Sequence, residues 1–124
     1  MRSALVPRVL GGLTAAYGAY TLARPTSLAR ATGLQPPDEP ASPRVRNVAR
    51  AIGARDLASG AAMVLASAGC PLQVATAVRV ACDLGDAVGF GLAVPPRFKG
   101  RVVAIAIGWG ALCASAFPAA GHAR

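Results

Sequence analysis

Residues 75–94, ATAVRVACDLGDAVGFGLAV, form a stretch that is apolar enough to cross a bilayer but carries three charges near its middle. The charges are Arg79, Asp83 and Asp86. On a helix that turns about 100° per residue, they fall within about 60° of one another and therefore share one face. A spanning helix with such a face needs a partner other than lipid, so this stretch decides which fold the chain can adopt.

The composition favours a membrane protein. The chain has 124 residues, of which 54% are hydrophobic and 15% charged, whereas about a quarter are charged in ordinary soluble domains. A chain of this length forms one domain. No alternation typical of strands occurs, so the predicted class is all-α.

Four apolar segments, at about 5–23, 49–68, 73–94 and 102–120, approach the roughly 20 residues that a spanning helix needs. The last of them carries no charge. The sequence therefore predicts a four-transmembrane-helix bundle that makes residues 1–124 a single integral membrane domain.

The connections between these segments carry turn signals. Residues 34–44 form a proline-rich loop, residues 68–73 a tight connection and residues 94–101 a short basic one. Residues 26–33 predict a short interfacial helix after the first span, capped by Thr26 or Ser27 and ended by Gly33.

The basic residues predict an orientation. Eight of them lie in the first and third connections: Arg24, Arg30, Arg44, Arg46, Arg50, Arg97, Lys99 and Arg101. Three lie at the chain ends: Arg2, Arg8 and Arg124. Because positive loops face the cytoplasm, we expect a multi-pass protein of the cell membrane with both termini outside the cytoplasm.

The partner expected from this pattern is the lipid bilayer. The net charge is +8, but aromatic residues make up only 5% and the arginines gather at span ends, so nucleic-acid binding is not expected. Cleavage of the first segment as a signal peptide is the alternative to its retention. Pro25, close after the would-be cut, and Arg8, inside the apolar run, favour retention.

The charged face of residues 75–94 calls for an internal partner. Three charges at membrane depth cost about 8 to 10 kcal/mol, which a few valines and leucines cannot offset. The second segment offers Arg55 and Asp56 in RAIGARDLASG. We expect Arg55 to pair with Asp86 and Arg79 with Asp83. Because two arginines face three aspartates, one carboxylate, Asp56 or Asp83, is expected near the interface or protonated.

A second face of the same helix carries the small residues Ala81, Gly85 and Gly89. This spacing is typical of close helix packing in membranes. It predicts a contact with another helix, and a homo-oligomer is one form that such a contact could take.

Other chemistry is sparse. Cys70, Cys82 and Cys113 have no paired metal-binding spacing, so no metal, cofactor or catalytic residue is expected. A structural or accessory role is favoured over an enzyme. A small transporter or channel subunit that uses the five-residue Arg/Asp network for proton or ligand coupling stays open, because ionisable groups at membrane depth often mark such pathways.

Three motifs carry a family resemblance: RVLGGLTAAYGAYTLARP, RAIGARDLASG and RxxxDLGDA. With them the chain resembles a family of small four-helix bacterial integral membrane proteins whose domain has no known function. The resemblance covers most of the chain. It implies the four-helix fold and the importance of Arg55, Asp56 and either Asp83 or Asp86, and it implies no activity.

Overall fold

The computed structural model describes residues 2–121, so Arg124 lies outside the described part of the chain. Within that part every regular element is a helix, which confirms the all-α prediction. The helices are α1 (Arg2–Ala23), α2 (Pro25–Thr32), α3 (Pro43–Leu65), α4 (Cys70–Ala93), α5 (Pro96–Ser115) and α6 (Phe117–Ala120).

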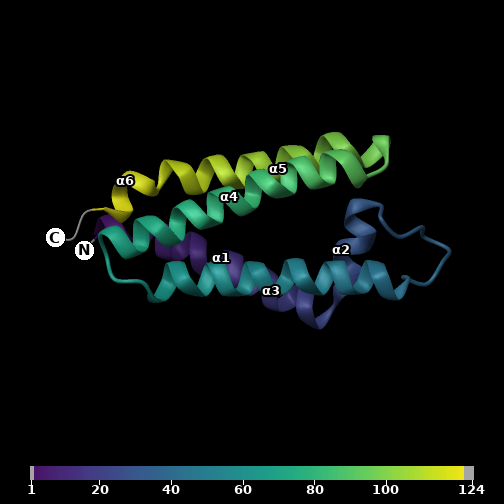
Figure 1. Ribbon diagram of the computed structural model, residues 1–124, viewed down its shortest axis with the longest axis horizontal. Helices are drawn as coiled ribbons and strands as arrows, with labels where there is room; N and C mark the ends of the chain where they lie inside the picture. The colour runs from purple at the N-terminus through teal and green to yellow at the C-terminus, as the bar shows by residue number, and fades with distance from the viewer. Residues whose placement is uncertain (1, 122–124) are drawn as a thin grey trace.

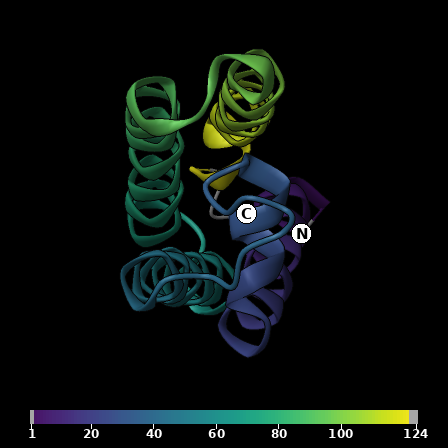
Figure 2. The same cartoon turned by 90° about the vertical axis from the view of Figure 1, so that its right-hand side faces the viewer.

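The four long helices form two pairs. α1 packs along α3, and α4 packs along α5, while α3 and α4 join the pairs (Figure 1). The pairs diverge toward one end, where α2 lies across the middle of the bundle (Figure 2). The start of α1 and the whole of α6 lie at the opposite end.

The α1/α3 pair is held together through glycines. A Cβ added to Gly60 would collide with the backbone of Ala15 and Gly11. A Cβ on Gly18 would lie 2.6 Å from the carbonyl oxygen of Gly53, and one on Gly53 would lie 2.9 Å from that of Gly18. Because Gly60 faces Gly11 and Gly18 faces Gly53, the two backbones approach more closely than ordinary side chains allow.

The helix starts correct three predicted boundaries. α3 begins at Pro43 rather than near residue 49, because the Ser42 side chain accepts a hydrogen bond from the Val45 amide and Pro43 suits the first turn. α5 begins at Pro96, so most of the predicted basic connection is helical. α4 begins at Cys70, three residues before the predicted start, after Gly69 at a φ of 99°.

Two further details of the prediction differ. α2 begins at Pro25, so neither Thr26 nor Ser27 is its N-cap; the Ser27 hydroxyl donates instead to the Arg24 carbonyl. Its end at Gly33, with a φ of 73°, is as predicted. The predicted helix 102–120 is divided at Ala116 into α5 and α6, because Pro118 lacks the amide hydrogen that a continuous helix requires there.

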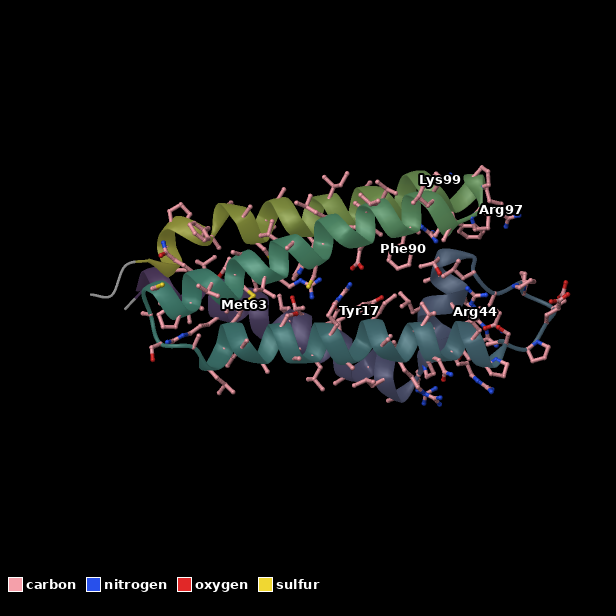
Figure 3. All side chains as sticks on the ribbon, in the orientation of Figure 1. Tyr17, Arg44, Met63, Phe90, Arg97 and Lys99 are labelled. Carbon is pink, nitrogen blue, oxygen red and sulfur yellow. The ribbon has the colours of Figure 1, made fainter. Side chains whose placement is uncertain are left out.

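The apolar core lies toward the end of the bundle that holds α6. Met63, Leu72 and Cys113 are fully buried there. The basic residues Arg44, Arg97 and Lys99 gather at the other end, beside α2, and Tyr17 lies between these ends (Figure 3).

By length and composition, one described helix, α5, could cross a membrane. α1, α3 and α4 are as long, at 22, 23 and 24 residues, but they do not meet the same criterion of composition.

Candidate functional site

Five charged side chains meet where α3 faces α4. Arg55 and Asp56 come from α3, and Arg79, Asp83 and Asp86 come from successive turns of α4. The structure therefore brings together all five residues of the expected network, with both expected pairs in contact. In water such a cluster would lie on a surface, but here four of its five side chains are mostly or fully buried.

Arg79 is the centre of the network. Its side chain is 1% exposed, and its Nη1 donates to Oδ1 of Asp56 at 2.7 Å and to Oγ of Ser59 at 2.8 Å. Its Nη2 donates to Oδ1 of Asp83 at 2.6 Å, one turn further along α4. One guanidinium thus ties α4 to two side chains of α3, with the fork geometry that lysine could not reproduce.

Arg55 makes the second link between the helices. Its Nη1 and Nη2 donate to the two carboxylate oxygens of Asp86, each at 2.7 Å. Its Nη2 also donates to Oδ1 of Asp56 at 2.9 Å. Asp56 therefore accepts from both arginines and connects the two expected pairs into one network.

The network carries an unbalanced charge. Two arginines against three aspartates leave a formal charge of −1. Among the described residues, Oδ2 of Asp83 is buried without a hydrogen-bond donor, and the Nε atoms of both arginines are buried without an acceptor. The sequence predicts that the surplus carboxylate is Asp56 or Asp83; in the structure Asp56 accepts two hydrogen bonds at Oδ1, and Asp83 holds the buried oxygen that has no donor among the described residues.

A cavity of about 490 Å³ adjoins the network between the two helix pairs. On the side of the network its wall consists of Asp56, Arg79, Asp83 and Asp86. Its other walls come from all five longer helices and are largely apolar, with Leu28, Phe90, Ile105 and Trp109 among them and with Thr14, Thr32 and Arg101 as further polar residues. A mostly apolar cavity with a few convergent polar groups is the usual form of a small-molecule site.

Two hydrogen bonds join distant helices beside this cavity. The Trp109 indole on α5 donates to Oγ1 of Thr14 on α1 at 3.1 Å. At the α2 end, Nη2 of Arg101 donates to the carbonyl oxygen of Ala31 at 3.0 Å. α2, expected from the sequence as an interfacial helix, thus also contributes Leu28, Ala31 and Thr32 to the cavity wall.

Several residues of the site were not predicted from the sequence. Ser59 and Thr14 look like ordinary polar residues of apolar helices, and only their position opposite Arg79 and Trp109 identifies their roles. Gly110 leaves room for Asp83, because a Cβ there would lie 3.0 Å from the Asp83 Cβ. Such contacts between helices have no signal in local spacing.

The predicted packing face of Ala81, Gly85 and Gly89 points outward. All three are exposed, and no described atom lies within 4 Å of a Cβ added to Gly85 or Gly89. Within the chain this face therefore contacts no second helix, and a contact with another copy stays a prediction.

Among residues 2–121, no three side chains of the metal-binding types are grouped closely enough to hold an ion.

The comparisons with known proteins identify the chain only at the level of a family. No curated protein and no solved structure matches the chain. The model of a family described as a domain of unknown function (DUF4267) matches residues 11–121, which include all six helices in whole or in part and the complete network. The chain therefore belongs to the DUF4267 family.

Proposed function

We propose that the protein is an integral membrane protein in which α1, α3, α4 and α5 cross the bilayer, and that its role is structural or accessory rather than enzymatic. The observation that carries this proposal is the distribution of polarity, which is reversed relative to a water-soluble bundle. Large apolar side chains cover the outside of the long helices, whereas charged and hydroxyl side chains are buried in the middle of the bundle, beside the apolar core at the α6 end.

The outward apolar residues occur along every long helix. Leu13 on α1 is 55% exposed, Val88 on α4 is 65% exposed and Ile105 on α5 is 65% exposed. Soluble proteins rarely expose so much contiguous apolar surface. In a bilayer, such residues favour insertion, and the internal ion pairs remove the charges of α3 and α4 from lipid.

The same reversal accounts for the composition of the helices. The charges in the middle of α3 and α4 reduce the apolar character of these helices, yet they face each other, and the other charges of α3 lie in its first two turns. Only 17% of the apolar stretch of α5 is buried, which is low for the core helix of a soluble protein. The basic residues at the α2 end favour an orientation with that end in the cytoplasm and both termini outside.

Membrane embedding is tested first by an alkaline carbonate wash of membranes from expressing cells. We expect the protein to stay in the pellet and to need detergent for release, because its exposed apolar surface would bind lipid. Release by carbonate would contradict the membrane proposal.

The same membranes test orientation through Cys70, which is exposed at the start of α4. A membrane-impermeant maleimide should label Cys70 in intact spheroplasts, and Cys70→Ala should remove that label. In the Cys70→Ala background, Asp38→Cys at the α2 end should react only after the cells are opened, because α3 separates the two positions. Labelling of both positions in intact spheroplasts would contradict a span at α3, and the reverse pattern would invert the orientation.

A small transporter or channel subunit is the second candidate. The unpartnered Oδ2 of Asp83 beside the cavity favours it, since a purely structural network would leave no buried acceptor free. Coupling would appear as proton flux into liposomes that Asp83→Asn abolishes, whereas a structural protein would carry no flux.

A further inference from the structure

The cavity beside the network has properties that point to one class of ligand. Asp83 is 4% exposed, it lines the cavity, and its Oδ2 accepts no hydrogen bond from any described residue. A buried carboxylate oxygen without a donor is costly, and a ligand N–H donor would remove that cost if the Asp83 carboxylate turned this oxygen toward the cavity.

Charge selects the sign of the ligand. The five charged side chains of the network sum to −1, so a monovalent cation beside them would neutralise that charge, whereas an anion there would add a second uncompensated one. Arg101 is the one further charged residue of the described lining, and it lies at the α2 end, where its Nη2 donates to the carbonyl oxygen of Ala31. Hard metal ions require about six to eight oxygen ligands, whereas among residues 2–121 the lining offers two carboxylate oxygens without a donor, Oδ2 of Asp56 and Oδ2 of Asp83, and its other walls are largely apolar.

The apolar walls of the cavity favour a ligand that also carries an apolar group. Phe90 and Trp109 line the cavity together with Leu28 and Ile105. Aromatic faces attract organic cations, and apolar side chains favour an alkyl or aryl group. A volume of about 490 Å³ holds a small amphiphile but is too small for a whole phospholipid.

We propose that the cavity binds a monovalent organic ammonium ion with an apolar group, whose N–H donates to the Asp83 carboxylate while the apolar group lies against Phe90, Ile105 and Trp109. The inference deepens the second candidate function by naming the chemical class that the network would bind. It does not depend on transport, because a binding site need not move its ligand across the membrane.

Trp109 gives a direct readout, since it is the one tryptophan of the chain and lines the cavity. Purified protein in nanodiscs is titrated with octylammonium, octanol and octanoate, which share their chain length and differ in charge. We expect a saturable change in tryptophan fluorescence with octylammonium, at an affinity at least about tenfold higher than that of the other two. Equal affinities would overturn the proposal, because they would indicate an apolar cavity without charge selection.

Two variants locate the site. Asp83→Asn should lower the octylammonium affinity about tenfold or more while octanol binding stays, because the neutral amide keeps the volume but loses the charge. Because Asp83→Asn also disturbs Arg79, a second variant leaves the network intact. Ala106→Phe fills the cavity from α5 and should remove octylammonium binding, whereas Ala104→Phe, the same change on an exposed alanine that does not line the cavity, should preserve it.

The outcomes separate the two proposals. Octylammonium selectivity that persists in Ala106→Phe would place the site elsewhere and overturn the inference. Protein that carbonate releases from membranes but that still binds octylammonium selectively would overturn membrane embedding and keep the cavity site. Selective binding without liposome flux would keep the site and remove the transporter.

Discussion

Arg79→Met is expected to destabilise the fold by about 3 to 5 kcal/mol, the usual cost of removing one partner from a buried ion pair. The guanidinium is 1% exposed and is the donor to Asp56, Ser59 and Asp83. Methionine has a similar length but no donor, so Asp83 would lose its one donor among the described residues and Asp56 one of its two. The measurement is the midpoint of unfolding of the purified protein by SDS, followed by circular dichroism.

Arg50→Met is the matched control, because Arg50 lies on the exposed surface at the start of α3. We expect a change within about 0.5 kcal/mol there. Arg79→Lys should fall between the two variants, since one ammonium cannot reproduce both ends of the guanidinium fork. If Arg79→Met and Arg50→Met unfolded at the same SDS concentration, the network would contribute no stability.

Gly60→Ala is expected to cost about 3 kcal/mol, at the upper end of the usual range for overpacking. The new methyl group would meet backbone atoms of Gly11 and Ala15, which cannot rotate away as a side chain could. α1 and α3 would therefore have to separate along their whole contact. The SDS midpoint and the fraction of protein recovered from membranes both report this loss.

Gly85→Ala provides the comparison, because no described atom lies within 4 Å of the added Cβ. We expect it to be neutral or to stabilise α4 by up to about 1 kcal/mol, the difference in helix propensity. A Gly60→Ala variant as stable as Gly85→Ala would show that the α1/α3 contact does not require glycine. A loss of stability in Gly85→Ala would instead indicate that Gly85 contacts a second copy of the chain.

The two ion pairs could be predicted because each depends on information that the sequence contains. Arg79 and Asp83 are four residues apart on one helix, and the depth of Arg55 and Asp86 follows from the rise of each helix. The hydrogen bonds from Arg55 and Arg79 to Asp56 could not be predicted in this way, because they depend on how α3 is rotated about its axis.

The close helix contact within the chain lies on other glycines than those of the predicted packing face. The small residues of α4 are spaced for packing but point outward, whereas Gly11 and Gly18 on α1 face Gly53 and Gly60 on α3. In each helix the two glycines are seven residues apart, which places them on one face, so this signal was present in the sequence. Their partner helix was not, since spacing alone cannot say which of several glycine faces meet.

The predicted starts of α3 and α5 differ from the observed ones for another reason. Hydropathy detects the apolar part of a helix, whereas α3 and α5 begin where Pro43 and Pro96 allow a first turn, about six residues earlier. The cavity itself arises from the divergence of the two helix pairs, a property of the assembled chain that no single segment encodes.

The close glycine contact between α1 and α3 also affects how the molecule can deform. Backbones in direct contact leave no side chains that could rearrange, so this pair would move as one rigid body. The hydrogen-bonded links from α3 to α4 through Arg55 and Arg79, and from α1 to α5 through Trp109, would then act as the hinge about which α4 and α5 swing. The attraction between the charged groups of such a hinge strengthens as water is excluded and weakens as water enters. The volume of the cavity would thus follow the hydration of a few charged atoms.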